Sequence, residues 1–499
     1  MAYALLFSVF IISTCGLVYE LTAGALASYL LGDSITQFSI IIGIYLSAMG
    51  LGSYLSKYIV KNLIPVFIKI ELLIGLVGGC SAALLFTVFE MAVHFRPVLY
   101  SLISVTGVLV GVEIPLIMRV LKNRFEFKDL VSKVFTFDYI GALFASLLFP
   151  ILLVPHLGLI RSSFMFGIIN VLVALWATYL FKEETARHKE LASASFILLA
   201  LLGTGFVYSD NILHFAETLN YKGSIIYARS TPYQRVVLAR EGDSLQMFIN
   251  GNLQFNSRDE YRYHEALVHP GLQSLKMPKQ VLVLGGGDGL AVREILKYDP
   301  VQSVTVVDLD PDITGLFKNN ELLVKLNNNS LNSPKVNVIN ADAFVWMRDN
   351  NNKRFDFIAV DFPDPSNFSL GKLYTNTFYR LLYNALNNNG VIVIQSTSPL
   401  VARKSFWCVV NTLQSVGFET TPYHAYLPSF GEWGYIIATK KAFAVPKQFI
   451  EGLRFITPES ARSMTEFSPD MGYLKTEINK LNNQALVRYF EEEWSRYVH

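Results

Sequence analysis

Four aspartates follow predicted strands in the second half of the chain: Asp288, Asp308, Asp342 and Asp361. Each comes at or just after a short apolar, β-branched run, which is typical of a strand buried on both faces of a parallel sheet. Ligands of such sheets bind beyond the carboxyl ends of the strands, so we expect the four carboxylates to face one crevice. A single aspartate here could be a helix cap or a turn residue. Four in succession indicate a site for a positively charged ligand.

One segment gives the order of elements that brings these acids together. An apolar strand at 281–284 runs into the turn Gly285–Gly289, a helix-like stretch follows, and a second strand ends on Asp308. This order is typical of a nucleotide-binding Rossmann unit, in which glycines let the backbone approach the ligand and the acid chelates a ribose diol. A pyrophosphate would be repelled by Asp288 inside the turn. The acids therefore favour a cationic nucleoside, such as a sulfonium compound, over a hydride-transfer cofactor.

Further strands are predicted on both sides of this unit. Two follow it, and the second leads into Asp361-Phe362-Pro363-Asp364-Pro365. Upstream, residues 211–275 contain short alternating runs with the hairpin-turn signal Asn250-Gly251, which predicts a small β domain. A helix is expected at 259–267. We therefore expect an α/β Rossmann-like, doubly wound domain of the class I methyltransferase type after the small β domain.

No metal site is predicted. The helical segment at 259–267 carries His264 and Glu265, and His269 follows shortly after. The two histidines are five positions apart, about 140° around a helix, whereas a zinc protease motif places them four apart on one face. The three cysteines form neither a Cys-x-x-Cys pair nor a disulfide framework.

The first 210 residues differ from the rest in composition. The chain has 499 residues, of which 52% are hydrophobic, and nearly all of the long charge-poor runs lie in this part. Runs of about 20 apolar residues can span a bilayer as helices. We expect an α-helical membrane domain of about seven spans, near 4–31, 35–56, 70–92, 97–118, 135–153, 158–181 and 191–209. The first run is too long and lacks the basic start of a cleavable signal, and small residues from Ala48 to Ser53 suit close helix packing.

Loop charges predict an orientation that conflicts with the chemistry. Most lysines and arginines flank the second, fourth and sixth loops between the expected spans, which places these loops in the cytoplasm. With seven spans the C-terminal half would then lie outside, whereas a nucleoside substrate made in the cytosol requires it inside. Either the run at 191–209 does not fully cross, or another span is miscounted, or the C-terminal half is external. On chemical grounds we expect a multi-pass protein of the cell membrane with a cytoplasmic C-terminal half.

Several motifs occur in a specific order in the second half. They are Thr231-Pro232-Tyr233-Gln234, Asn250-Gly251 with Gln254, Arg258-Asp259-Glu260-Tyr261 through Tyr263-His264-Glu265, the glycine turn, Val307-Asp308, Ala341-Asp342-Ala343 and Asp361–Pro365. From about residue 225 to 440 the chain therefore resembles the polyamine aminopropyltransferases, the spermidine synthase family. The whole chain is similar to the subgroup with an N-terminal multi-span membrane domain. The domains implied are 1–210, transmembrane; 211–275, small β; 276–445, Rossmann-like core; and 446–499, a helical C-terminal extension.

The resemblance implies that decarboxylated S-adenosylmethionine is the co-substrate and that no prosthetic group is used. It implies that Asp308 holds the ribose hydroxyls, where the family more often has Glu, and that Asp342 accepts from the adenine amino group. Asp288, with Gln234 and His264 nearby, would pair with the ammonium of the aminopropyl arm. Intact S-adenosylmethionine would bring its own carboxylate to Asp288 and be repelled. The donor-binding residues implied are Gln234, His264, Gly285, Gly287, Asp288, Asp308, Asp342 and Ala343.

The acceptor implied is an amine, with putrescine converted to spermidine and 5′-methylthioadenosine released. Asp361 would be the base or charge partner of the attacking amine, assisted by Tyr263, because an amine is a nucleophile only when neutral. Both would also contact the acceptor, and Asp364 would help to hold the diamine.

The acceptor side departs from the family pattern. The family usually has small hydroxyl residues where this chain has Phe362-Pro363, and a tyrosine common at the acceptor site is missing from the later loop. Glu432 and Trp433 in that loop either rebuild a diamine pocket, with Glu432 at the distal ammonium and Trp433 as a cation–π face, or pack as an ordinary loop.

Three carboxylates lie within or near the expected spans: Glu20, Glu113 and Asp138. Ionisable groups are costly inside a membrane and usually face a partner or a cavity. They are either polar clasps between helices or the lining of a passage for a polyamine or another cation.

Two other functions stay open from the residues alone. One is an S-adenosylmethionine-dependent methyltransferase on the same fold, which Asp288 and the Asp361/Asp364 pair disfavour. The other is a polyamine transporter or sensor with a nucleoside-binding domain, which the complete set of acids disfavours. The partners expected are putrescine or a related polyamine and the lipid bilayer, and the association of soluble relatives implies a homodimer. No basic patch with interleaved aromatic residues occurs, so no nucleic-acid partner is expected.

Overall fold

The chain forms two compact units, Met1–Ile225 and Ile226–His499, each with hydrophobic cores of its own. The structure is a computed structural model and describes residues 2–31, 34–91, 95–122, 125–213 and 223–494. Residues 214–222, at the start of the expected small β domain, lie outside the described residues. Of the described remainder of that domain, residues 211–213 and 223–225 belong to the first unit. Residues 226–275 belong to the second unit, together with the expected core and the described part of the C-terminal extension.

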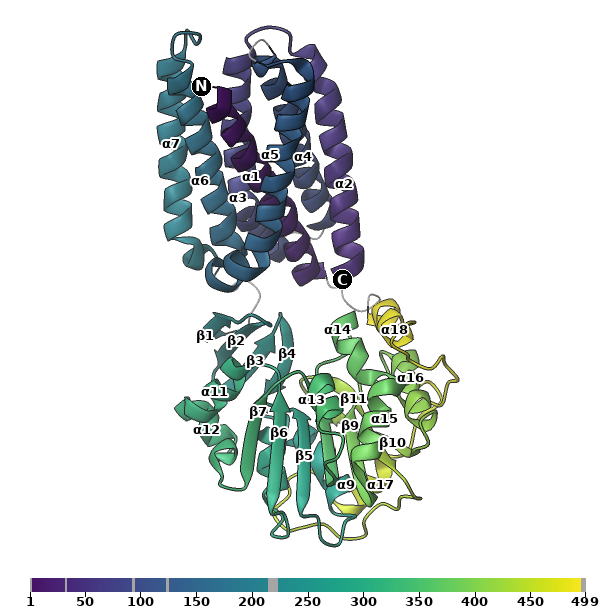
Figure 1. Cartoon of the computed structure of the whole chain (residues 1–499). Coiled ribbons are helices and arrows are strands. Elements are labelled where there is room, and N and C mark those ends of the chain that lie inside the picture. Colours follow the sequence, from purple (N-terminus) through teal and green to yellow (C-terminus); the bar gives the residue numbers. More distant parts are fainter. Residues whose placement is uncertain (1, 32–33, 92–94, 123–124, 214–222, 495–499) are drawn as a thin grey trace. The chain divides into compact units, whose positions relative to one another are not determined.

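Seven long helices make up most of the described part of the first unit (Figure 1). They overlap the seven apolar runs of the sequence, although α3 and α5 each begin seven or eight residues earlier than expected. Among the described residues, six stretches are long and apolar enough to cross a bilayer, judged by length and composition alone, and one of them, Phe127–Leu180, contains two of the helices. The helices are α1 (Ala2–Leu31), α2 (Ser34–Leu55), α3 (Leu63–Met91), α4 (Phe95–Leu121), α5 (Phe127–Leu148), α6 (Val154–Leu180) and α7 (His188–Val207).

Small residues let α2 and α4 approach backbone to backbone, as the run from Ala48 to Ser53 predicts. A Cβ at Gly52 would lie 2.0 Å from the carbonyl oxygen of Val108. On α4, a Cβ at Gly111 would lie 2.1 Å from the carbonyl oxygen of Met49. The close packing is therefore confirmed at Gly52, whereas a Cβ at Gly50 would meet no atom within 4 Å.

A four-stranded sheet opens the second unit, in the order β1-β2-β3-β4. The predicted turn joins β3 to β4, and its residues Asn250 and Gly251 have φ values of 50° and 80°, as a tight hairpin turn requires. Phe255 of β4 packs edge-on against Phe317 of the α/β part, so the small sheet shares a core with it. The strands are β1 (Ser224–Ser230), β2 (Arg235–Glu241), β3 (Ser244–Ile249) and β4 (Asn252–Asn256).

A seven-stranded sheet forms the centre of the second unit, in the order β10-β11-β9-β8-β5-β6-β7. Neighbouring strands from β9 through β7 are parallel, and β11 runs antiparallel to both β9 and β10. The expected Rossmann-like arrangement is therefore present as a mixed sheet. Its strands are β5 (Gln280–Gly285), β6 (Ser303–Asp308), β7 (Val336–Asn340), β8 (Phe355–Asp361), β9 (Leu386–Gln395), β10 (Glu419–Leu427) and β11 (Gly431–Thr439).

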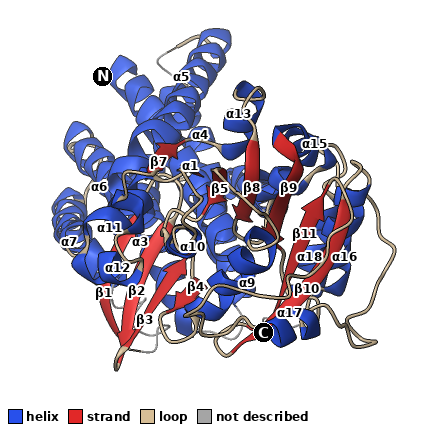
Figure 2. Ribbon diagram, turned by 90° about the horizontal axis from the view of Figure 1, so that it is seen from below, coloured by secondary structure: helices blue, strands red, loops and turns tan. Residues whose placement is uncertain are grey.

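The two faces of this sheet bury separate cores, because successive strand side chains point to opposite sides. On β5, Val281 and Val283 belong to one core, and Leu282 and Leu284 belong to the other. Helices cover both faces (Figure 2). They are α9 (Glu260–Leu272), α10 (Leu290–Ile295), α11 (Pro311–Asn319), α12 (Glu321–Leu326), α13 (Ala343–Asp349), α14 (Phe368–Gly371), α15 (Asn376–Ala385) and α16 (Arg403–Gln414).

The C-terminal segment is less helical than expected. Its described part contains two short helices, α17 (Pro458–Ser463) and α18 (Ala485–Trp494), and otherwise follows the core in irregular conformation. A buried side chain of α9 forms hydrogen bonds with its backbone. Both carboxylate oxygens of Glu265 accept from the N–H groups of residues 454–456 at 2.8–3.0 Å. Glu265 therefore anchors this segment, which explains one acid of the α9 motif as structural.

We expect Glu265→Ala to release the segment around residue 455, because three N–H groups lose a charged acceptor. A hydrogen bond to a charged group contributes about 1.5–3 kcal/mol, so exchange of each of these three amides in the full chain should accelerate by about 10- to 100-fold. Hydrogen-exchange mass spectrometry measures this. Glu459→Ala, which removes an exposed glutamate of α17, is the matched control and should change nothing. Unaltered exchange in Glu265→Ala would contradict the anchoring role.

Candidate active site

Three strand ends meet at the glycine turn after β5. Gly285 lies opposite Asp361 of β8, and a Cβ at Gly285 would lie 2.2 Å from the carbonyl oxygen of Asp361. A Cβ at Gly287 would lie 2.7 Å from the carboxyl carbon of Asp308, the last residue of β6. Gly285 also has a φ of 77°, which favours glycine. The absence of these side chains is what allows two of the predicted aspartates to contact the turn.

The backbone holds Asp308 in a fixed orientation. Its Oδ2 accepts from the N–H of Gly287 at 3.0 Å, and its Oδ1 accepts from the N–H of Asp310 at 2.9 Å. Burial raises the pKa of Asp308 to about 6, although the two N–H groups act in the opposite direction. A carboxylate oxygen can accept more than one hydrogen bond, so Asp308 retains acceptor positions for a diol.

Gln234 bonds to Asp310 rather than to Asp288. Its Nε2 donates to Asp310 Oδ2 at 2.9 Å, and the hydroxyl of Thr231 donates to the same oxygen at 2.8 Å. Asp310 is fully buried and caps α11 with its other oxygen. The motif from Thr231 to Gln234 thus docks the small sheet on the loop that follows Asp308. Asp310 was missed from the sequence because its role depends on the distant Thr231 and Gln234.

The predicted catalytic pair is in direct contact. The hydroxyl of Tyr263, on α9, donates to Asp361 Oδ1 at 2.6 Å. Burial raises the pKa of Asp361, whereas His264 and the Tyr263 hydroxyl lower it. Burial also raises the pKa of Asp288, to about 6, and His264 again acts against it. Both carboxylates therefore depend on a nearby positive charge to stay ionised.

That positive charge is on His264, which pairs with Glu260, and Glu260 in turn pairs with Arg293. His264 Nδ1 lies 2.9 Å from Glu260 Oε2 and 2.8 Å from the Glu260 carbonyl oxygen. Arg293 donates to both carboxylate oxygens of Glu260, each at 2.9 Å. Burial alone would lower the pKa of His264, but Glu260 outweighs it and raises the pKa to about 9. His264 therefore carries its charge at neutral pH beside Asp288 and Asp361.

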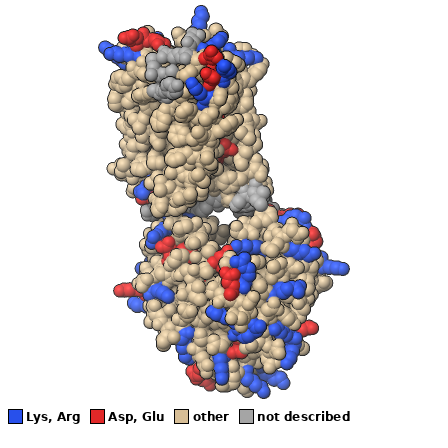
Figure 3. All heavy atoms as spheres, in the orientation of Figure 1, with Lys and Arg blue, Asp and Glu red and all other residues tan. Residues whose placement is uncertain are grey.

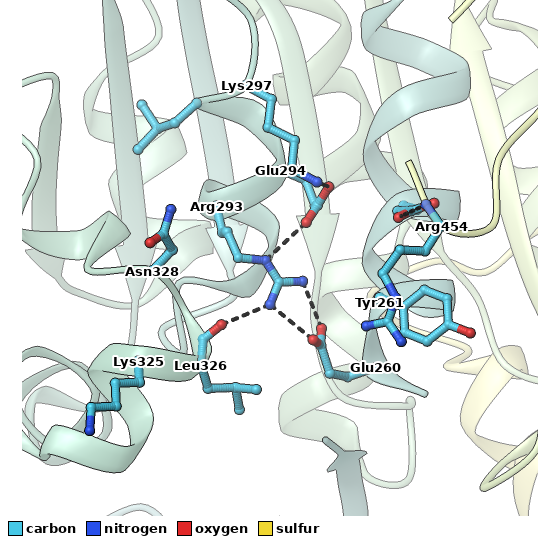
Figure 4. A pocket seen from close by; sticks show the side chains of 11 residues that line it. Glu260, Tyr261, Arg293, Glu294, Lys297, Lys325, Leu326, Asn328 and Arg454 are labelled. Atoms are coloured by element: carbon cyan, nitrogen blue, oxygen red, sulfur yellow. Dashed lines mark hydrogen bonds and ion pairs between the residues drawn. The ribbon is translucent and has the colours of Figure 1, made fainter. Parts of the chain in front are cut away.

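A pocket of about 430 Å³ lies on the Glu260 and Arg293 end of this chain (Figure 4). Two of the acids that line it already take part in ion pairs. Arg293 pairs with Glu260 and Glu294, and Lys297 also pairs with Glu294. His269 contacts Glu294 and Tyr298, each at 2.8 Å, so it shares no partner with His264. Within the described ranges, no three His, Cys, Asp or Glu side chains group as a metal site would require. The carboxylates at the glycine turn are therefore the candidate site.

Asp342 serves as a helix cap. Its Oδ1 accepts from the N–H groups of Phe344 and Val345, at 2.8 and 3.2 Å, at the start of α13, where Ala343 is the first residue. Its Oδ2 pairs with Lys372 at 2.5 Å. Burial would raise the pKa of Asp342, but Lys372 and the N–H groups lower it. The cap interpretation is confirmed for this aspartate, and its contact with an adenine stays a prediction.

A second group of polar side chains lies at the ends of β8 and β9. Gln395 accepts from the indole N–H of Trp433 at 3.1 Å, donates to the hydroxyl of Tyr374 at 3.2 Å, and donates to the carbonyl of Phe362. One oxygen of Asp364 has no hydrogen-bond partner in the described part of the chain. Burial raises the pKa of Asp364 to about 7. Gln395, at the end of β9, and Tyr374, in a short 3₁₀ helix, were missed because neutral residues in such places have no distinctive pattern.

Glu432 and Trp433, predicted together, point to opposite faces of β11, since they are successive residues of a strand. Trp433 contacts Gln395. Glu432 instead pairs with His424 of β10, whose other ring nitrogen lies 2.7 Å from the carbonyl oxygen of Glu466. The structure therefore brings Trp433, but not Glu432, to the group that contains Gln395 and Asp364.

Comparisons with known proteins identify the family. The Spermine/spermidine synthase domain matches residues 260–448. A polyamine aminopropyltransferase of Leptospira interrogans is 53% identical over 498 residues, with 100% of each chain covered, and polyamine aminopropyltransferase 2 of Ralstonia nicotianae is 52% identical over 499 residues, with 98% of each covered. A crystal structure of a spermidine synthase in complex with the transition-state analogue AdoDATO is 25% identical, covers 49% of this chain and 85% of that chain, and has a TM-score of 0.46. On the strength of relatives that match over its whole length, this chain is an enzyme of the polyamine aminopropyltransferase family.

Proposed function

We propose that this enzyme moves the aminopropyl group of decarboxylated S-adenosylmethionine to putrescine, forming spermidine and releasing 5′-methylthioadenosine. The observation that carries the proposal is the contact between Tyr263 and Asp361 beside the glycine turn, with Asp308 at the end of the adjacent strand. Together with Asp288, these groups supply acceptors for a ribose diol, carboxylates for cations and an acceptor for a proton.

The donor would bind with its ribose at Asp308 and its ammonium at Asp288. A hydrogen bond to a charged group contributes about 1.5–3 kcal/mol, so either contact is large enough to decide the affinity. The arm of intact S-adenosylmethionine carries a carboxylate, which would meet Asp288 and Asp361 in a partly buried site where like charges repel more strongly than in water. The decarboxylated compound is therefore the donor that suits these acids.

The transfer requires a neutral amine, because an ammonium has no electron pair with which to attack. A nitrogen of putrescine would give its proton to Asp361 and attack the methylene carbon of the aminopropyl arm that is bonded to the sulfonium sulfur. The C–S bond breaks, its electrons stay on sulfur, and the sulfonium becomes the neutral thioether of 5′-methylthioadenosine. The new secondary amine keeps the positive charge, and Asp361 passes its proton to solvent. Tyr263 would hold Asp361 in place during this exchange.

The far end of the diamine would lie between Asp364 and Trp433. Asp364 has an oxygen without a partner, and its pKa of about 7 would fall when an ammonium binds beside it. The Trp433 ring, fixed by Gln395, offers an aromatic face to the ammonium or the methylene chain.

We also propose that the first unit spans the cell membrane and that the second unit uses cytoplasmic substrates. Large apolar side chains on its helices face outward, and Leu46, Tyr139, Leu143 and Ile197 are each more than half exposed. Charged side chains on the visible face gather near the ends of the unit and leave a broad middle mostly uncharged (Figure 3). Apolar surface of this extent suits lipid better than water.

The reaction is tested by measuring 5′-methylthioadenosine release from the detergent-purified full chain, with putrescine beside either decarboxylated or intact S-adenosylmethionine. Release is expected with the decarboxylated donor only. Asp361→Asn should lower kcat by at least about 100-fold, the usual contribution of a general base. Asp349→Asn, which changes an exposed aspartate, is the control. A methylated product from the intact donor, or no release with putrescine, would overturn the proposal.

Donor affinity should fall as the pH is lowered through about 6, because the pKa values of Asp288 and Asp308 are both about 6. Protonation removes the charges that bind the donor, so the loss appears on the acid side. The neutral product 5′-methylthioadenosine is the matched ligand, because its affinity should depend on Asp308 but not on Asp288. Calorimetric Kd values for both ligands across this pH range should therefore show the steeper loss for the donor, and equal slopes would exclude a role for Asp288.

Glu260→Gln should move this pH dependence of donor affinity to higher pH. Without the Glu260 carboxylate, burial lowers the pKa of His264, and the neutral imidazole no longer favours ionised Asp288. The pKa of Asp288 is about 6, so a rise of one unit would leave about half of this carboxyl ionised at pH 7. We therefore expect about a twofold weaker donor at neutral pH and about a tenfold weaker donor where the pH lies well below 6. Glu294→Gln is the matched control, because Glu294 also pairs with Arg293 but not with His264. An equal shift in both variants would assign the effect to Arg293 instead.

A further inference from the structure

Two carboxyl groups meet inside the first unit. Glu71 lies on α3 and Glu113 on α4, and their side chains are 0% and 1% exposed. The two groups are within hydrogen-bonding reach of each other. One oxygen of each, Oε1, has no protein donor among the described residues. Only Glu113 was noted from the sequence, because Glu71 lies at the edge of the third expected span.

Neutral groups fix the remaining oxygen of Glu71. The side-chain amide of Asn170, on α6, donates to Glu71 Oε2 at 2.7 Å, and the hydroxyl of Tyr19, on α1, donates to Asn170 Oδ1 at 2.9 Å. Gly78 leaves room for the Tyr19 ring, since a Cβ there would lie 2.7 Å from it. The chain orients Asn170 as a donor to Glu71. Four helices, α1, α3, α4 and α6, thus hold one polar site.

Among the residues that the structure describes, no positive side chain pairs with either glutamate. The titratable groups that face it are Cys15 and Tyr19 on α1, Tyr45 on α2 and Asp138 on α5. None of these carries a positive charge, and neither glutamate takes part in an ion pair within the described ranges. Two ionised carboxylates in contact would repel each other and would also lack solvation. The hydrogen bond between them therefore requires a proton.

We propose that Glu71 and Glu113 form a proton-binding site of the first unit, occupied at neutral pH, whose proton leaves only when α3 and α4 move apart. Buried carboxylates inside membranes commonly serve proton relays. A point of weakness lies beside the site: Pro115 has no N–H to donate to the carbonyl of Gly111, so α4 lacks a backbone hydrogen bond there. While the helices stay together, loss of the proton would leave two like charges in contact, so proton release and helix separation are coupled.

Infrared spectroscopy of the full-length protein tests the site. A protonated carboxylic acid has a C=O stretch that shifts in D₂O. Asp364, whose pKa is about 7, contributes such a band to every variant, so the glutamate pair is measured in native-minus-variant difference spectra at neutral pH. The differences for Glu71→Gln and Glu113→Gln should each contain the band, because the glutamine N–H donates to the remaining carboxylate and replaces the proton. Asp138→Asn removes another carboxyl of the first unit and should leave the band of the pair unchanged. Difference spectra without the band for both glutamine variants would overturn the proposal.

Helix movement is measured at Cys15, which is 0% exposed and close to both glutamates. With Cys80 and Cys408 replaced by alanine, alkaline pH should raise labelling of Cys15 by a membrane-permeant maleimide severalfold more in the native pair than in the Glu71→Gln/Glu113→Gln double variant. The reactive species is the thiolate, which two ionised glutamates nearby would disfavour. This electrostatic effect would slow labelling of the native protein, so it cannot produce the expected difference. Equal labelling would overturn the coupling of proton loss to movement.

Aminopropyl transfer separates this inference from the proposed function. Glu71 and Glu113 lie in a different unit from the glycine turn, so the double variant should keep the transfer rate of the native protein in detergent. A protein that transfers no aminopropyl group yet loses the infrared band in the glutamine variants would refute the proposed reaction and leave the proton site standing.

Discussion

The ion pair between Glu260 and His264 keeps a positive charge next to a group of carboxylates that the fold partly withdraws from water. Burial favours the neutral form of Asp288 and Asp361, and a neutral acid cannot attract a cation or take its proton. His264 opposes this, and it stays charged only because Glu260 stands one helical turn before it, held in turn by Arg293. The site therefore contains alternating charges from Arg293 to the carboxylates, in which each ion stabilises the next.

The glycine turn sets the distances over which these charges act. At Gly285 and Gly287 any side chain would overlap the neighbouring strand ends, so the turn can approach Asp308 and Asp361 as closely as backbone allows. The same closeness restricts what can bind. A ligand with a negative group would have to place it among carboxylates, whereas a diol and an ammonium find acceptors already oriented by the backbone, as Asp308 is by two N–H groups.

The elements and acids that could be predicted are those that depend on adjacent residues. The end of β5 is marked by an apolar run followed by glycines, and the end of β6 by an apolar run followed by an acid. The hairpin at Asn250-Gly251 is likewise predicted from adjacent residues. Partnerships across the fold were missed: Glu260 had no assigned role, and Gln395 has no pattern at all. The separation of Glu432 from Trp433 followed from strand alternation, but that rule applies only once the segment is known to be a strand rather than a loop.

Both units contain buried carboxyl groups in an environment that disfavours their negative charge. The two units differ in what compensates for that charge. In the second unit the compensation is a fixed cation, because the proposed reaction requires Asp288 and Asp361 to remain ionised while still open to a ligand. In the first unit no cation among the described residues pairs with Glu71 or Glu113, so we infer that a proton compensates. A fixed cation cannot leave, and it makes a permanent site; a proton can leave, and it makes a site with two states. A hydrogen bond that exists in only one of these states ties the packing of α3 and α4 to proton binding, which a purely apolar contact between these helices could not do.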